Sequence, residues 1–290
     1  MQKARLAVVA SELLLLLLGV SACSSGDAPS SSAPSSDSSA SSSASNRGTV
    51  ESVDESLEVV AESLPYAEVG DELIYGYFAF PANMVDPLPA VLVVHDRWGL
   101  NDDVRNHVER LAAGGYIVLG VDLFAGKSAQ DSASARELEI AVIENRQTAQ
   151  TNIRQAIEFV QTSSSPPSVS IVGFGFGGGW ALNAAIDQPE ELGAAISYYG
   201  QVPTEETEIQ SLDVPYLGFF SESDRAVPIA SAREFSQKAN ALSKDVEIMT
   251  FAEARRGFAE QSGATFDPSA SQTAWSHMLQ FLDARVSSTE

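Results

Sequence analysis

A glycine-rich turn between a predicted strand and a predicted helix gives the clearest chemical signal in this sequence. The apolar run Ser168–Phe174 predicts a strand that passes directly into a helix through Trp180. Gly173 and Gly177 give the turn the pattern G-x-Nuc-x-G of a nucleophile elbow, whose central residue presents a reactive side chain. The central residue here is Gly175, which has no side-chain atom that could attack a carbonyl carbon. The turn therefore predicts the backbone of a hydrolytic site without its nucleophile.

The same glycines also match G-x-G-x-x-G, the dinucleotide-binding fingerprint. This match lies on a mid-chain strand, and the next predicted strand ends in Tyr198-Tyr199-Gly200, without an acid to hold a ribose hydroxyl. Dinucleotide binding is therefore the weaker interpretation, and no cofactor is expected.

Strands and helices alternate around this turn. The predicted strands are Leu73–Phe80, Ala90–His95, Tyr116–Leu123, Ser168–Phe174, Ala194–Tyr199, Tyr216–Phe220 and Glu247–Phe251. Several are continuous apolar runs, as expected of parallel strands that are covered on both faces, and Ala133–Gln161 is predicted as one long helix or two in series. The pattern predicts an α/β fold with a mostly parallel, doubly wound sheet, helices on both faces, and a binding crevice at the carboxyl ends of the strands.

Four motifs follow one another along the chain. They are His95–Asn101 (HDRWGLN), Tyr116–Leu123 (YIVLGVDL), the turn around Gly175, and Asp224 followed by Ala254–Phe258 (ARRGF). From about residue 65 to 287 they resemble the dienelactone hydrolase family of α/β-hydrolases, whose motifs include H-E-x-x-G-L-N, G-Y-x-x-x-x-x-D-L and A-x-H-G-F. The resemblance implies the α/β-hydrolase fold and, in members with a complete triad, hydrolysis of esters or lactones.

The sequence departs from the family pattern at the positions that perform this chemistry. The nucleophile position is Gly175, and the position of the triad histidine is Arg256, which stays protonated and cannot act as a base. Of the triad, only Asp224 is retained. The glutamate of the first loop is Asp96, and the family's carboxylate-binding arginine is replaced by Glu260. The resemblance therefore implies a catalytically degenerate hydrolase, a pseudoenzyme that acts as a binding or interaction module.

The resemblance also implies a retained oxyanion site, because the backbone N–H groups of Arg97 and Phe176 occupy the positions that form it in the family. The residues that we expect to line the pocket beside it are His95, Asp96, Trp98, Tyr199 and Glu260. An alternative function uses this site: an active ester or lactone hydrolase in which His95 or Asp96 activates water near the two amides. The other interpretation of His95 is a buried, hydrogen-bonded structural residue.

Four of the chain's few basic residues, Arg97, Arg225, Arg255 and Arg256, lie on the predicted strand-end loops. This grouping fits a pocket for a small anionic or ester-like ligand, in which Arg256 forms a charge-assisted pair with Asp224. The alternative is a set of surface ion pairs, whose acidic partners would be Asp96, Glu222, Glu253 and Glu260.

The N-terminus resembles an export signal. Residues 1–22 contain Lys3 and Arg5, an apolar stretch and the ending Val-Ser-Ala before Cys23, which resembles a bacterial lipobox. We expect a signal peptide over 1–22, lipidation of Cys23, a serine-rich flexible tether over 23–63 and the hydrolase-like domain over 64–288. The protein would then be exported and lipid-anchored to the cell envelope, whereas a plain secretory signal with a chance cysteine is the alternative.

The overall charge limits the classes of partner. The 290 residues contain 39 acidic and 17 basic side chains, a formal net charge of −22. Such a surface repels phosphate backbones, so nucleic acid is excluded as a partner and membrane contact is expected through the lipid only. One cysteine and three scattered histidines also argue against a metal site. The acidity fits either a high-salt habitat or an acidic secreted protein.

Overall fold

The computed structural model describes residues 57–84 and 87–286. The predicted signal peptide, Cys23 and most of the predicted tether lie outside the described residues. The family-like domain is described almost throughout.

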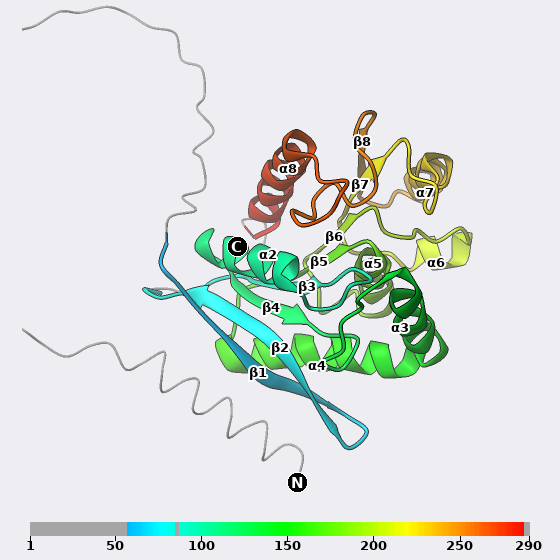
Figure 1. The fold of residues 1–290 in the computed structure, drawn as a ribbon. Helices are drawn as coiled ribbons and strands as arrows, with labels where there is room; N and C mark the ends of the chain where they lie inside the picture. The colour runs from blue at the N-terminus through cyan, green and yellow to red at the C-terminus, as the bar shows by residue number, and fades with distance from the viewer. Residues whose placement is uncertain (1–56, 85–86, 287–290) are drawn as a thin grey trace, which may run out of the picture.

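Eight strands form a single sheet in the order β1-β2-β4-β3-β5-β6-β7-β8 (Figure 1). They are β1 (Val59–Val69), β2 (Glu72–Pro81), β3 (Ala90–Val94), β4 (Ile117–Val121), β5 (Val169–Phe174), β6 (Ala194–Tyr198), β7 (Tyr216–Ser221) and β8 (Val246–Phe251). The pairings β1–β2 and β2–β4 are antiparallel, and all the others are parallel. The predicted mostly parallel, doubly wound sheet is confirmed.

Helices cover both faces of the sheet, so the central strands are continuous apolar runs. Every residue of β3 to β7 is buried. One face packs against α2 (Asp102–Ala113) and α8 (Pro268–Val286). The other packs against α4 (Arg146–Ser164), α5 (Phe176–Asp187), α6 (Glu206–Gln210) and α7 (Ile229–Ala241).

The segment predicted as one helix or two is two helices, α3 (Ser132–Glu144) and α4. The chain turns between them at Asn145, whose φ and ψ of −109° and 43° depart from helical values. Asp131 caps α3 through a capping box with Ser134. Only Ala135 and Val142 of α3 are buried, so this helix lies on the outside of the fold with most of its side chains accessible.

The domain boundary predicted at Leu64 is too late, because β1 begins at Val59. The first half of this edge strand is mostly exposed and has only β2 as a neighbour. Its side chains therefore lack the continuous apolar pattern by which the central strands were recognised.

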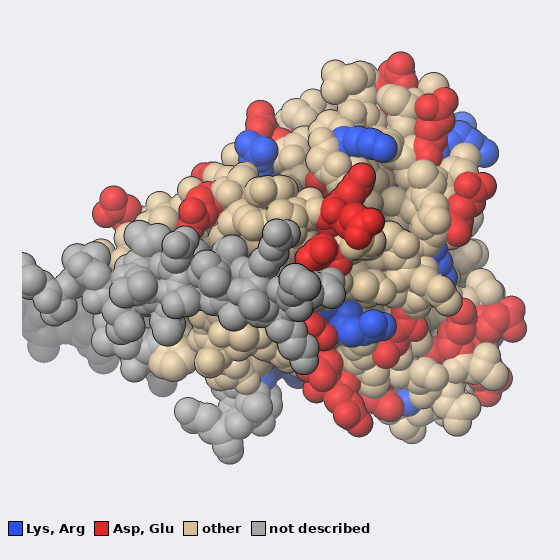
Figure 2. Space-filling view, turned by 90° about the horizontal axis from the view of Figure 1, so that it is seen from below, with Lys and Arg blue, Asp and Glu red and all other residues tan. Residues whose placement is uncertain are grey.

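Acidic side chains are spread over the face of the molecule shown in Figure 2, with fewer basic side chains among them. Within the residues that the structure describes, no helix combines the length and the apolar character needed to cross a bilayer.

Candidate functional site

The loops that follow the parallel strands meet at the carboxyl edge of the sheet and enclose a hollow of about 560 Å³. From strand ends come Arg97, Gly175, Phe176, Gln201, Ala226 and Arg256. From helices come Arg136, Glu139, Ile140, Ile143, Arg146, Gly179, Trp180 and Asn183. The hollow lies where a doubly wound sheet is expected to bind its ligand.

The turn at the centre of this hollow has the backbone of a nucleophile elbow. Gly175 has a φ of 51° and a ψ of −108°, a conformation that is strained for residues with a Cβ. Gly173 and Gly177 lie so close that a Cβ on Gly173 would overlap the Gly177 backbone. The strand-to-helix turn is therefore intact although its central side chain is missing.

The side chain of Asp96 fills the space that a nucleophile would need. A Cβ on Gly175 would overlap the Asp96 carboxylate, and Asp96 Oδ1 accepts a hydrogen bond of 2.7 Å from Phe176 N–H. Phe176 is the first residue of α5, and Gly175 provides no side-chain cap. Asp96 thus stabilises the amino end of α5 from a separate loop, as an anion does at a helix N-terminus.

A second carboxyl group lies against Asp96. Glu260 forms a side-chain hydrogen bond with Asp96, and it also accepts a hydrogen bond of 3.3 Å from the hydroxyl of Tyr199. Burial, followed by the negative charge of Asp96, raises the pKa of Glu260 to about 9. Burial, reinforced by Glu260, likewise raises the pKa of Tyr199 well above its ordinary value. At neutral pH Glu260 therefore keeps its proton and can donate it in a hydrogen bond to Asp96.

Arg256 replaces the triad histidine as the partner of Asp224. Its Nη1 lies 3.0 Å from Asp224 Oδ2 and donates a hydrogen bond of 2.6 Å to the carbonyl oxygen of Tyr199. The other oxygen of Asp224 accepts hydrogen bonds from the backbone N–H groups of Ala226 and Val227. A carboxylate held in this way can orient a cation, but its partner has no basic nitrogen with which to accept a proton.

The family model of the dienelactone hydrolase family matches residues 74–286. The chain belongs to the dienelactone hydrolase family. A relative in Saccharolobus solfataricus, named "Putative carboxymethylenebutenolidase", is 27% identical over 240 residues, which cover 70% of this chain and 92% of that protein. Protein usf of Aquifex pyrophilus is 26% identical over 201 residues, 67% of this chain and 87% of its own.

Solved structures agree with this fold. The dienelactone hydrolase-like promiscuous phosphotriesterase P91 from metagenomic libraries superposes with a TM-score of 0.71 at 20% identity, covering 78% of this chain and 98% of its own. The predicted α/β-hydrolase fold is thereby confirmed.

His95 is buried and fully engaged, which argues against its acting as a base. Its Nδ1 lies 2.7 Å from the carbonyl oxygen of Asp96, and its Nε2 accepts a hydrogen bond of 3.0 Å from Leu123 N–H. This pattern defines the neutral tautomer with the proton on Nδ1 and leaves Nε2 no free lone pair for water. The alternative in which His95 activates water is not supported by this geometry.

Five residues predicted to line the pocket lie behind it instead. None of the five belongs to the wall of the hollow: Asp96, Trp98 and Glu260 border a smaller cavity beside it, and His95 and Tyr199 border neither. A strand-end position alone does not tell whether a side chain points toward solvent or back under the turn.

Helices α3 and α4 contribute a part of the wall that was not predicted from the sequence. Arg136, Glu139, Ile140 and Ile143 follow the spacing i, i+3, i+4, i+7, so one face of α3 borders the hollow. This spacing was visible in the sequence. Nothing in the sequence, however, indicated that α3 lies beside the elbow.

The arginines of the hollow are only partly neutralised. Arg97 pairs with Glu139 at 3.2 Å, and Arg256 with Asp224. Arg136 and Arg146 form no ion pair within the part of the chain that is described, and Arg146 lies 5.7 Å from the centre of the Trp180 ring.

Within the described residues, the four arginines form no ion pair with the acidic partners considered from the sequence. Arg225 and Arg255 lie outside the hollow, and the nearest hydrogen-bond partner of Arg255 is the carbonyl oxygen of Ala264 at 3.4 Å. Glu222 pairs with Arg233 on α7 instead. The positive charge around the hollow therefore comes from α3 and α4, through Arg136 and Arg146, as well as from the strand-end loops.

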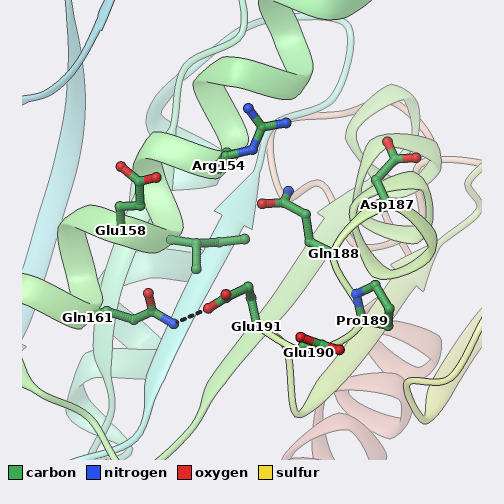
Figure 3. A pocket seen from close by; sticks show the side chains of 9 residues that line it. Arg154, Glu158, Gln161, Asp187, Gln188, Pro189, Glu190 and Glu191 are labelled. Carbon is green, nitrogen blue, oxygen red and sulfur yellow. Dashed lines mark hydrogen bonds between the residues drawn. The ribbon is translucent and has the colours of Figure 1, made fainter.

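A second hollow of about 390 Å³ lies at the opposite edge of the sheet, between α4 and the end of α5 (Figure 3). Its wall contains Glu158, Asp187, Glu190 and Glu191, with Arg154 as the one base, and Gln161 hydrogen-bonds to Glu191. Across the described ranges, no group of histidine, cysteine and acidic side chains has the geometry of a metal site.

Proposed function

We propose that this protein is a catalytically degenerate dienelactone hydrolase family member that binds small organic anions in the hollow beside Gly175. The observation on which the proposal depends is that Asp96 fills the nucleophile space while arginines surround the hollow. Family membership alone would favour hydrolysis, but Gly175 at the nucleophile position and Arg256 at the histidine position argue against it.

Lack of turnover follows from the chemistry of the substituted positions. Gly175 cannot attack an ester carbonyl, and the Arg256 guanidinium cannot remove a proton from water or a thiol. In a serine protease, loss of the nucleophile alone costs about 10⁶ in turnover, and loss of the base as well adds little. The Phe176 amide, which would stabilise an oxyanion, is occupied by Asp96.

Anion binding follows from the balance of charge in the hollow. Four arginines border it, and carboxylates neutralise only two of them. Trp180, Ile140 and Ile143 add an apolar wall beside Arg136 and Arg146. A small aromatic or aliphatic carboxylate or phosphate matches both features, because guanidinium groups bind such anions through paired hydrogen bonds.

The proposal includes the location of the protein. The basic and apolar N-terminal segment that ends at Cys23 supports export and lipid anchoring, which would leave the domain tethered at the cell envelope. Substituting Cys23→Ala should move the protein from the membrane fraction to the soluble fraction of its native host. Retention of the variant in the membrane fraction would contradict the lipid anchor.

Isothermal titration calorimetry with benzoate and phenyl phosphate tests the binding function directly. We expect saturable binding by the unaltered protein, and a Kd raised about 10-fold by Arg136→Gln or Arg146→Gln, because each removes one charge-assisted contact. Lys244→Gln is the matched control, since Lys244 pairs with Asp213 away from the hollow and its loss should leave the Kd unchanged.

Two results would contradict the binding function. One is the absence of saturable heat with either anion. The other is an equal effect of all three substitutions, which would indicate a general response to net charge rather than a site.

A further inference from the structure

The amide at the amino end of α5 already holds a carboxylate that belongs to the chain itself. Phe176 N–H donates to Asp96 Oδ1 at 2.7 Å, and the Asp96 side chain lies where a side chain on Gly175 would begin. Asp96 is only 8% exposed. An oxyanion or a ligand carboxylate approaching this amide from the hollow would meet the Asp96 carboxylate first.

The neighbours of Asp96 keep its carboxylate in this place. Glu260 hydrogen-bonds to it from the loop after β8, and the Tyr199 hydroxyl holds Glu260 from the end of β6. Two buried carboxyl groups in contact cannot both be ionised, so the proton on Glu260 lets this group donate to Asp96.

A small cavity lies beside the pair. A cavity of about 10 Å³ is bordered by Asp96, Glu260, Trp98 and His107, among others. This volume suits one water molecule and excludes an organic ligand. His107 Nε2 is buried and makes no hydrogen bond with the described part of the protein.

We propose that the elbow end of the hollow is a carboxylate-binding site that Asp96 occupies as an internal ligand, with Glu260 holding it there. The inference rests on the proposed function in that it concerns the same hollow. External anions bind at the arginine end while Asp96 is in place. A small carboxylate binds at the Phe176 amide once the Asp96 side chain is removed.

Rescue of Asp96→Ala by formate tests this assignment. The substitution leaves the amino end of α5 without its anion and lowers Tm. Sodium formate should restore part of the loss, with a saturable rise in Tm of about 3–6 °C at ten times its Kd. Sodium chloride at the same ionic strength should have a smaller effect that does not saturate.

Asp96→Asn is the matched control, because its amide oxygen still accepts from Phe176 and still fills the site while the charge is removed. We expect no formate-dependent rise in Tm for Asp96→Asn or for the unaltered protein. If Asp96→Ala does not fold, Asp96→Ser provides the same space with a smaller loss and is tested in the same way.

The assignment is overturned if formate leaves the folded truncated variant unchanged, or raises the Tm of all variants equally. Either outcome is independent of the benzoate titration, which reports the arginine end of the unaltered protein. Failure of the proposed function and failure of this inference are therefore distinguishable.

Discussion

At the scale of single residues, the site depends on the placement of one carboxylate. A nucleophile at residue 175 and the Asp96 carboxylate in its present position exclude each other sterically. The missing nucleophile side chain therefore leaves room that Asp96 uses, at the end of a helix where an anion is favoured. The cost falls on Glu260, which must keep a proton at a pH at which exposed glutamates have lost theirs.

Substituting Glu260→Gln should remove the free-energy cost of keeping residue 260 protonated at neutral pH. Because the pKa of Glu260 is raised in the folded protein, the unfolded chain releases a proton that the folded protein keeps. The free energy of unfolding should therefore fall as pH rises from about 5 to 9. The introduced glutamine imitates the protonated group, donating to Asp96 and accepting from Tyr199, and should raise the free energy of unfolding by about 2 kcal/mol at pH 8.

Urea unfolding at pH 5 and pH 8 measures this difference. Asp103, Tyr199 and Asp96 all face Glu260 and are unchanged in the variant. Glu222→Gln is the control, because Glu222 is exposed and paired with Arg233, and its loss should change the free energy by less than about 0.5 kcal/mol at either pH. If the free energy of unfolding depends on pH equally in Glu260→Gln and in the unaltered protein, the raised pKa of Glu260 is refuted.

At the scale of elements, the strand-to-helix turn keeps the backbone of a nucleophile elbow although Gly175 has no nucleophilic side chain. The turn keeps its positive φ at Gly175 and its close glycine contacts, so α5 still begins at the carboxyl edge of the sheet.

Gly175→Ala should be destabilising for two separable reasons. A Cβ at this φ and ψ is strained by about 1–3 kcal/mol, and it also displaces the Asp96 carboxylate. In the Asp96→Ala background only the strain remains. Urea unfolding of the two single variants and the double variant should therefore give a coupling energy of about 1–3 kcal/mol. Additive losses would show that Asp96 does not occupy the space beside residue 175.

The sequence predicted elements better than side-chain directions. Continuous apolar runs identified the central strands, and the glycine spacing identified the elbow, because burial on both faces and close backbone packing leave direct traces in residue types. The edge strand β1 left no such trace in its exposed first half. Whether Asp96 points under the turn, and whether Arg146 borders the hollow, depends on how separate elements pack.

At the scale of the whole molecule, the excess of acidic side chains opposes the compact state. A formal net charge of −22 on 290 residues creates repulsion that dissolved ions screen. Four of the 17 basic side chains border the hollow, where a bound anion would add a favourable charge interaction.

Salt should stabilise the protein. Thermal unfolding in sodium chloride from about 0.05 to 2 M should show Tm rising by several degrees, with most of the rise below about 1 M, where the screening length falls to about 3 Å. A Tm that rises in proportion to salt over the whole range would indicate solvent exclusion rather than screening. A constant Tm would show that charge repulsion does not limit stability.

The central claim is that the site is disarmed by particular substitutions within an otherwise intact hydrolase architecture. The most direct measurement is the initial rate of p-nitrophenyl acetate hydrolysis by the unaltered protein and by the variant Asp96→Ala, Gly175→Cys, Arg256→His. This variant restores a thiol, a base beside Asp224 and the space for both. We predict a background rate for the unaltered protein and saturable turnover for the variant. Saturable turnover by the unaltered protein that is lost in Asp224→Asn would contradict this claim.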